Sequence, residues 1–210
     1  MNKDYIIRLE GEADYRTTEN LTRESFWNVY QPGCTEHYVL HCYRSNPDFI
    51  PELDFVMERE GIIIGHVMFS KAEIISDDGR SIPILTFGPI SIAPDFKRKG
   101  YGLALLKHAL EKAGAMGFGA VCMEGNIDFY GKAGFVLASS LNIHYHAEPR
   151  ENDVPYFLAL ELKPGYLNGV EGTYHTPEGY YVAFNNPEEF EEYESTFPYK
   201  EKLVLPGQLQ

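Results

Sequence analysis

The middle of the chain carries a pattern of apolar and polar positions that predicts three consecutive β-strands. Runs rich in β-branched and aromatic residues cover residues 53–57, 62–70 with a continuation to 75, and 82–92. Glu60-Gly61 and Asp78-Gly79 separate these runs and are typical of tight turns. Strands joined by such short turns pair in an antiparallel manner, so the pattern predicts a meander.

Helical periodicity follows between residues 100 and 116. Apolar side chains recur at Leu103, Leu106, Leu110 and Ala113, which places them on one stripe of a helix. A short apolar run at residues 120–123 then predicts a buried strand. Strand, helix and strand in this order predict a right-handed crossover and one parallel pair within an otherwise antiparallel sheet.

Shorter elements are expected on both sides of this region. They are a strand at 5–9, helices at 14–30 and 35–43, a short helix at 128–133, and strands at 143–145 and 156–162. Residues 169–184 are rich in tyrosine and glycine and predict an aromatic hairpin that turns near residues 177–179. Asn186-Pro187 then starts a glutamate-rich helix.

The expected fold is mixed α/β (α+β): a central, mainly antiparallel sheet flanked by helices, with a C-terminal hairpin-helix extension. We expect one domain over residues 1–164. Residues 165–210 would form the extension and pack on the same domain, because so short a segment rarely folds alone.

Composition narrows the classes of partner. The chain of 210 residues has 31 acidic and 18 basic residues, a formal net charge of −13, which disfavours nucleic acid and anionic membrane surfaces as partners. Its three cysteines include no C-x-x-C pair, which favours a reducing compartment. The N-terminal residues lack the apolar stretch of a signal peptide, and no run is long enough to span a bilayer. We therefore expect a cytoplasmic protein.

A basic turn stands out in this acidic chain. Lys97, Arg98 and Lys99 come directly before Gly100-Tyr101-Gly102, at the start of the helix expected from residue 100. Helix N-termini favour anions, so three cations there indicate a turn that receives an anionic ligand, with glycines that let the backbone approach it. The spacing alone leaves a second interpretation open, an exposed and solvated turn. It matches neither a P-loop nor a dinucleotide-binding motif.

Two segments resemble the GCN5-related N-acetyltransferase (GNAT) family. Residues 87–106, FGPISIAPDFKRKGYGLALL, resemble its acetyl-CoA-binding segment, with Lys97-x-x-Gly100-x-Gly102 in place of the usual Arg/Gln-x-x-Gly-x-Gly/Ala. Residues 124–135, EGNIDFYGKAGF, are similar to a run in a bacterial subgroup of predicted acetyltransferases, with Ile127 where proline is frequent. The run at 159–165, ALELKPG, also looks like that subgroup. The order of the expected elements matches the family fold over residues 4–162.

The resemblance implies a cofactor site and a mechanism. The strands at 90–92 and 120–123 would splay apart and hold the arm of acetyl-CoA, the co-substrate, with the Ile92 N–H facing the thioester oxygen and stabilising the oxyanion. The implied cofactor-binding residues are Ile90, Ser91, Ile92, Lys97, Arg98, Lys99, Gly100, Tyr101, Gly102 and Asn126. Tyr130 matches the family's proton donor to the leaving thiolate. The alternative is that Tyr130 only packs the short helix on the sheet.

The general base is left open among several acids. Glu124, at the end of the second splayed strand, is the first candidate, and Glu52 and Glu36 lie in segments that would cover the acceptor side. Each is also readable as a solvated surface group. The histidine pairs His37/His41 and His144/His146 have spacings seen among metal ligands, but neither shows a third ligand, and we expect no metal.

Transfer of an acetyl group from acetyl-CoA to an amine is the function that the resemblance implies. The acceptor would be a small molecule or a peptide, and the acidic surface favours a cationic one. The protein would be a monomer or a homodimer. The main alternative is a non-catalytic acyl-CoA-binding sensor or regulatory module, and a third is a structural protein whose basic turn binds an acidic partner.

Overall fold

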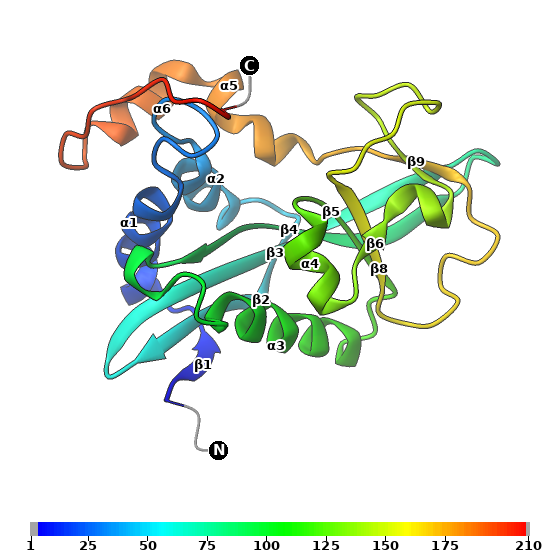
Figure 1. Ribbon diagram of the computed structural model, residues 1–210, viewed down its shortest axis with the longest axis horizontal. Helices are drawn as coiled ribbons and strands as arrows, with labels where there is room; N and C mark the ends of the chain where they lie inside the picture. The colour runs from blue at the N-terminus through cyan, green and yellow to red at the C-terminus, as the bar shows by residue number, and fades with distance from the viewer. Residues whose placement is uncertain (1–3, 209–210) are drawn as a thin grey trace.

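A central mixed sheet organises the molecule in the computed structural model, which describes residues 4–208 (Figure 1). Its strands are β1 (Ile6–Leu9), β2 (Phe49–Arg59), β3 (Ile62–Ser76), β4 (Ser81–Ile92), β5 (Ala120–Glu124), β6 (Val136–Leu137), β7 (Ile143–Tyr145), β8 (Phe157–Glu161) and β9 (Gly172–Tyr174). The helices are α1 (Tyr15–Phe26), α2 (Glu36–Tyr43), α3 (Tyr101–Ala115), α4 (Ile127–Tyr130), α5 (Val182–Asn185) and α6 (Pro187–Glu194), with short 3-10 turns between some of them.

The strand order confirms the predicted fold class. The sheet runs β1-β2-β3-β4-β5-β8-β6, and the meander of β2, β3 and β4 is antiparallel as predicted. β4 and β5 form the expected parallel pair across helix α3, with Leu85 opposite Val121. A second parallel pair, β7 with β9, was not predicted.

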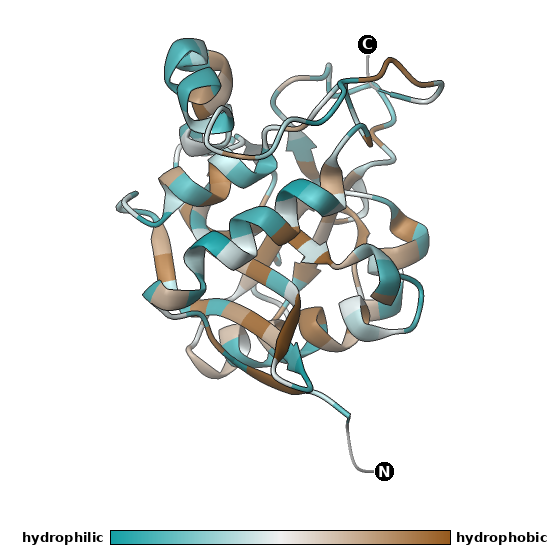
Figure 2. Cartoon of the chain, turned by 90° about the vertical axis from the view of Figure 1, so that its left-hand side faces the viewer, coloured by the Kyte–Doolittle hydropathy of each residue, from teal (hydrophilic) through white to brown (hydrophobic). Residues whose placement is uncertain are grey.

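The two faces of the sheet are covered by different helices. Helix α3 packs on one face through Leu105, Leu106, Ala109, Leu110 and Ala113, all buried. The predicted stripe thus holds from Leu106 onward, whereas Leu103 is only half-buried. Helices α1 and α2 cover the other face, where Val39, Leu40 and Tyr43 pack on Met68 of β3. Figure 2 shows the strands largely in brown, whereas the helices around them alternate brown and teal.

The predicted aromatic hairpin over residues 169–184 is wrong. Only β9 is extended there, and it lies between β3, to which it is antiparallel, and β7, to which it is parallel. Both of its edges are therefore occupied, which leaves no edge for a hairpin partner. From Pro177 the backbone turns helical, first as a 3-10 turn over Glu178–Tyr181 and then as α5.

Two predicted helices also differ at their ends. The first stops at Phe26 rather than residue 30, because Trp27 is extended and Asn28 has a φ of 58°. The glutamate-rich helix begins at Pro187 as predicted, but the Asn186 side chain does not cap it and donates instead to the carbonyl oxygen of Val182.

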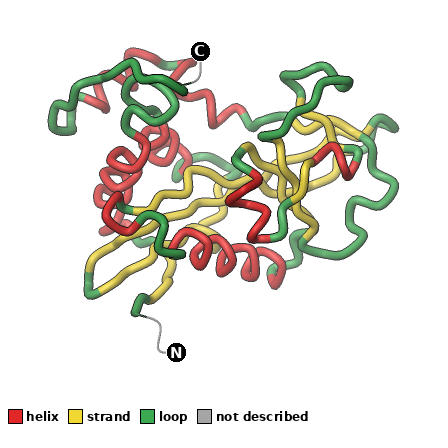
Figure 3. Tube along the Cα trace, viewed as in Figure 1, coloured by secondary structure: helices red, strands yellow, loops and turns green. Residues whose placement is uncertain are grey.

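The last part of the chain packs on helices α1 and α2, where Figure 1 draws it in orange and red. Arg23 of α1 is 1% exposed and makes an ion pair of 2.5 Å with Glu194 of α6, which also accepts from His37 at 2.8 Å. Beyond α6, the carbonyl oxygen of Glu201 accepts from Trp27 and Asn28 in the loop after α1. Much of this C-terminal stretch is loop (Figure 3), yet its contacts reach both N-terminal helices.

Candidate cofactor and catalytic site

The two parallel strands at the centre of the sheet separate beyond one registered pair. Leu85 of β4 lies opposite Val121 of β5, and no later pair is registered among the described residues although β4 continues to Ile92. The Ala93 N–H donates to the Ile64 carbonyl oxygen of β3. Because N–H groups alternate in direction along a strand, those of Ile90 and Ile92 point away from β3 and into this opening.

The start of helix α3 lies beside the opening and carries no side-chain cap. Gly100 occupies the N-cap position at a φ of 88°, a left-handed conformation that favours glycine. Nothing lies within 4 Å of the place where its Cβ would be, so the backbone is open on that side, and the first N–H groups of the helix have no partner within it. Gly102 fills a narrower place, since a Cβ there would lie 3.4 Å from Ile92 and 3.5 Å from Phe129.

The three cations of the basic turn are not equivalent. The Lys97 ammonium donates to the Ser25 carbonyl oxygen near the end of α1 at 2.8 Å, and burial lowers its pKa. It therefore lies at the negative end of that helix and neutralises part of its charge. Lys99 donates to the carbonyl oxygen of Asp95, and Arg98 is exposed at a φ of 61°. The Tyr101 hydroxyl donates to Asp4.

Buried Ser91 and Ser25 tie the strand to helix α1. The Ser91 hydroxyl donates to the Thr22 hydroxyl at 3.0 Å, so its side chain supports the strand from the α1 side. The Ser25 hydroxyl donates to the carbonyl oxygen of Ile92 at 3.0 Å. Of the predicted strand residues, Ile90 and Ile92 thus offer N–H groups to the opening, while Ser91 serves as support.

Tyr130 ends helix α4 on the same side of the sheet as α3. Its ring lies 5.8 Å from that of Phe87 on β4 and 5.9 Å from that of Phe135, and burial raises the pKa of its phenol above the ordinary value. The ring fits only because residue 125 is glycine, where a Cβ would stand 2.3 Å from the Tyr130 ring. Asn126 caps α4 by accepting from the N–H of Asp128 at 2.8 Å.

The candidate bases lie in different surroundings. Glu124 is exposed at the end of β5, and its carboxylate accepts from the Thr176 hydroxyl at 3.0 Å. Glu36 accepts from the N–H of Thr35 at the start of α2, and burial raises its pKa. Its charge raises the pKa of Tyr30, already raised by burial, and Tyr30 in turn contributes to the raised pKa of Tyr130. Glu52 is exposed on β2.

The histidine pairs do not form shared ligand sets. His37 is buried and paired with Glu194, whereas His41 is bonded to Glu19. His146 stacks on His175 with ring centroids 5.1 Å apart, and His144 and His146 are both half-buried.

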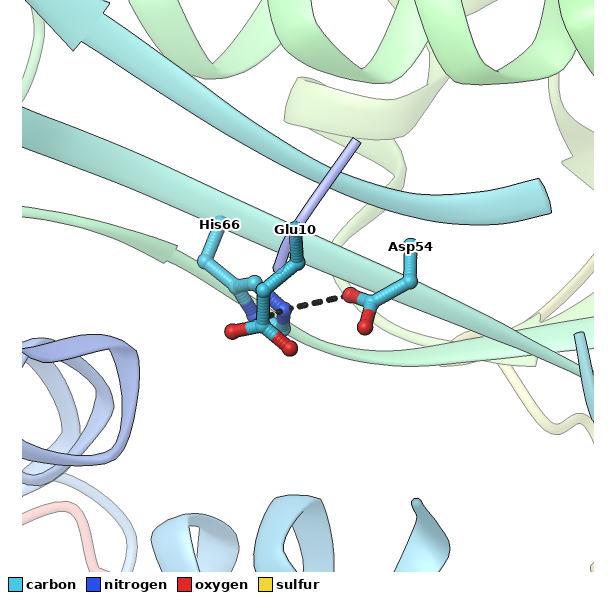
Figure 4. A group of neighbouring side chains, drawn as sticks. All are labelled: Glu10, Asp54 and His66. Atoms are coloured by element: carbon cyan, nitrogen blue, oxygen red, sulfur yellow. Dashed lines mark hydrogen bonds and ion pairs between the residues drawn. The ribbon is translucent and has the colours of Figure 1, made fainter. Parts of the chain in front are cut away.

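A buried cluster that sequence reasoning missed lies under β3 on the α1 and α2 side. Figure 4 shows Glu10, Asp54 and His66 side by side, with their potential ligand atoms all within 4.8 Å of one another. The His66 Nε2 and the Asp54 Oδ1 are 2.7 Å apart. His66 stands opposite Ser91 in the sheet, so the cluster adjoins the strand that lines the opening.

Arg44 supplies this cluster with its cation. Its guanidinium donates to both oxygens of Glu10, at 3.1 and 3.0 Å, and to Glu19 at 2.5 Å. Since this donor fork already occupies Glu10, the arrangement fits a hydrogen-bonded charge network better than a metal centre. A lone histidine within an apolar strand was the available signal, but its acidic partners lie 12 and 56 positions away (66 − 54 and 66 − 10).

The extension also contributes residues that sequence reasoning missed. Thr176 holds Glu124, and the Tyr180 hydroxyl donates to the Gly88 carbonyl oxygen of β4 at 3.2 Å. Their signal was the richness of residues 169–184 in tyrosine, but the predicted hairpin assigned these side chains to the wrong structure. None of the helices among residues 4–208 is long and apolar enough to cross a membrane.

Comparisons with solved structures agree with this fold. The GNAT family N-acetyltransferase YhbS from Escherichia coli, in complex with CoA, matches with a TM-score of 0.72 and 23% identity over 84% of this chain and 92% of its own. A GNAT family acetyltransferase from Brucella melitensis, in complex with acetyl-CoA, gives 0.66 and 21% over 84% and 97%. The ribosomal-protein-S18-alanine N-acetyltransferase from Escherichia coli gives 0.53 and 17% over 76% and 94%.

The search of curated proteins gave no match. The family model described as "Acetyltransferase (GNAT) family" matches residues 20–135, more than half of the chain, and includes the opening, the basic turn and Tyr130. This match confirms the resemblance stated from the two motifs. The chain belongs to the GNAT acetyltransferase family.

Proposed function

We propose that this protein transfers an acetyl group from acetyl-CoA to an amine. The observation that carries the proposal is the meeting, at one place on the sheet, of the opening between β4 and β5, the uncapped first turn of α3 and the Tyr130 side chain. Two solved structures with the same fold hold CoA or acetyl-CoA.

The residues present fit acetyl-CoA. The uncapped N–H groups after Gly100 would bind the pyrophosphate, where the left-handed glycine keeps side-chain atoms out of the way. Arg98 and Lys99 add positive charge beside them. The N–H groups of Ile90 and Ile92 would bind the pantetheine arm and the thioester oxygen. When the amine nitrogen attacks the thioester carbon, these fixed donors stabilise the negative charge on that oxygen.

Tyr130 acts as the general acid in this scheme. As the carbon–sulfur bond breaks, its hydroxyl proton passes to the sulfur, which leaves as a thiol rather than a thiolate. The raised pKa keeps the phenol protonated until that moment. Burial raises the pKa of a thiolate as well, as it does for Cys122 in this chain, so the sulfur accepts the proton more readily than in water.

The attacking amine must lose a proton to a base. We assign this role to Glu124, which ends β5 at the opening and is oriented by Thr176. Glu36 is the second candidate because burial raises its pKa toward neutral pH, where a general base works best. Comparison of the pH–rate profiles of Glu124→Gln and Glu36→Gln separates them, since removal of the base abolishes the acidic limb of the profile.

We propose a cationic small molecule or peptide as the acceptor, because the chain carries a net charge of −13. A non-catalytic acyl-CoA-binding module is the second candidate function. Its supporting observation is Lys97, which replaces the family's usual arginine or glutamine and is bonded to Ser25. We also propose that residues 1–164 and the extension at 165–210 act as one folded unit.

Two measurements test the proposal. Saturating CoA should raise the melting temperature, because a ligand that binds only the folded state adds about 2.7 kcal/mol at 100 times Kd. Thiol release from acetyl-CoA should then rise with at least one amine in a panel of polyamines, aminoglycosides and peptides. A melting shift without thiol release by any amine would favour the binding module, and the absence of both would overturn the cofactor site.

A further inference from the structure

The strand that lines the opening carries a β-bulge. Val67 of β3 lies opposite Ile90, whereas Phe69 lies opposite Phe87. Between these two pairs β4 therefore advances by three residues and β3 by two. The extra residue falls at Gly88-Pro89, with Gly88 at a φ of 152°. A bulge interrupts the regular ladder and redirects the groups beside it, so its geometry decides where the following N–H groups of Ile90 and Ile92 point.

Tyr180, from the 3-10 turn after β9, holds this bulge. Its hydroxyl donates to the Gly88 carbonyl oxygen at 3.2 Å and lies 3.5 Å from the Ser70 hydroxyl. Its ring stands 3.6 Å from the place where a Cβ on Gly88 would be. The carbonyl group at the bulge therefore has a partner that belongs to neither neighbouring strand.

The support behind Tyr180 is itself tightly packed. The ring of Tyr43 on α2 lies 4.9 Å from the Tyr180 ring, and a Cβ on Gly179 would stand 2.8 Å from Tyr43. β9, six residues before Tyr180, is paired on both edges with β3 and β7. The Tyr180 hydroxyl is therefore held by a backbone segment that is fixed on both sides, as a positioning residue requires.

We infer that Tyr180 is a positioning residue for acetyl transfer, which acts by fixing the Gly88 carbonyl and, through the bulge, the N–H groups that stabilise the oxyanion. The inference rests on the proposed function. It makes residues outside the segment matched by the family model part of the working site.

The chain offers a matched control. The Tyr166 hydroxyl donates to the Pro83 carbonyl oxygen, also on β4, at 2.7 Å. Tyr166→Phe and Tyr180→Phe each remove one hydrogen bond from a tyrosine to a β4 carbonyl, five residues apart (88 − 83) on the strand. A general loss of stability would affect both variants alike, whereas positioning predicts an effect of Tyr180→Phe alone.

The experiment measures kcat and KM for acetyl-CoA with an amine that supports thiol release, together with amide hydrogen exchange across residues 86–92. We expect Tyr180→Phe to lower kcat about tenfold or more, because small displacements of fixed catalytic groups cost that much. KM for acetyl-CoA should change little, since the α3 N-terminus is untouched, and exchange at 86–92 should become faster. Tyr166→Phe should match the wild type in all three.

Wild-type kcat in Tyr180→Phe, or an equal loss in both variants, would overturn the inference. If the wild type releases no thiol with any amine, acetyl transfer is what fails, and the exchange data still decide the anchoring of the bulge. Faster exchange in Tyr180→Phe alone would then support that anchoring, and unchanged exchange would overturn it.

Discussion

The two sides of strand β4 are built in different ways. On the α3 side, the opening, the uncapped helix start and Tyr130 all come from residues 87–130. Their positions follow from elements that are neighbours in the sequence. On the α1 and α2 side, Tyr43 lies more than 100 residues before Tyr180, and their rings meet only through the packing of the extension. The α3 side, which we propose binds the cofactor and call the cofactor side, is built from one continuous segment. The α1 and α2 side, which we propose faces the acceptor and call the acceptor side, is assembled from distant segments.

The largest expected effect is a loss of activity when Tyr130, on the cofactor side, is replaced by phenylalanine. Tyr130→Phe keeps the ring among Phe87, Phe129 and Phe135 but removes the hydroxyl that we propose as the proton donor. We expect kcat to fall by about 10²–10⁴-fold, the usual range for a general acid, with CoA affinity nearly unchanged. Steady-state thiol release and a CoA-dependent melting shift measure the two quantities. An unchanged kcat would return Tyr130 to a packing role.

The same division explains what the sequence could predict. The meander, the crossover helix and the GNAT motifs are local patterns, and the structure confirms the elements they predict. The hairpin over residues 169–184 failed because the choice of partner for β9 depends on β3 and β7, which periodicity does not contain. Lys97 was predicted as an anion ligand, but only the packing of α1 shows that its ammonium faces Ser25.

A second prediction tests whether the stability of the α1 and α2 side depends on the contacts of the extension. Glu194→Gln removes the charge that pairs buried Arg23 and His37, and breaking a buried pair costs about 3 kcal/mol or more. The denaturation midpoint should fall accordingly. Glu192→Gln, an exposed glutamate of the same helix, is the control and should stay within about 0.5 kcal/mol of the wild type. Equal effects of both variants would contradict the dependence.

The pH dependence of the Glu194 contribution has a definite sign. Burial raises the pKa of its carboxyl, but hydrogen bonds from His37 and Arg23 lower it more, so the net shift is downward. A carboxyl with a depressed folded pKa stabilises the protein above its unfolded pKa, and that stability is lost as the pH falls through the folded pKa. The gap between wild type and Glu194→Gln should therefore narrow below about pH 4.5, the ordinary pKa of glutamate.

A third prediction tests the proposed phosphate site on the cofactor side with a matched pair of glycines. Gly100 and Gly79 have φ angles of 88° and 87°, and nothing lies within 4 Å of either missing Cβ. Replacement by valine should therefore strain both backbones similarly, by about 1–2 kcal/mol. Only Gly100→Val should also lose the CoA-dependent stabilisation, about 2.7 kcal/mol at 100 times Kd. Thermal melting with and without CoA measures both terms, and a retained shift in Gly100→Val would contradict the phosphate site.

The smallest expected effect concerns the buried cluster of Glu10, Asp54 and His66 on the α1 and α2 side of the sheet. Burial raises the pKa of Asp54 to about 6, from the ordinary aspartate value of 3.8, and lowers the pKa of His66 to about 4. A carboxyl whose folded pKa is raised binds more protons in the folded state, so stability falls as the pH rises from about 4 to 6. His66 acts in the opposite direction over the same window and offsets part of this fall.

Asp54→Asn isolates these opposing contributions. Asparagine keeps a carbonyl oxygen for His66 but does not titrate, so the contribution of Asp54 is lost. Relative to the wild type, stability should then rise as the pH increases from 4 to 6, against the smaller opposing contribution of Glu10, whose pKa burial also raises. Because contributions of groups in one buried network are not additive, we expect a rise of about 1–2 kcal/mol rather than the full value of the shift. Urea denaturation at half-unit steps of pH measures it. Asp95→Asn, an exposed site near the basic turn, should keep the wild-type profile. A flat profile in Asp54→Asn would contradict the lowered pKa of His66.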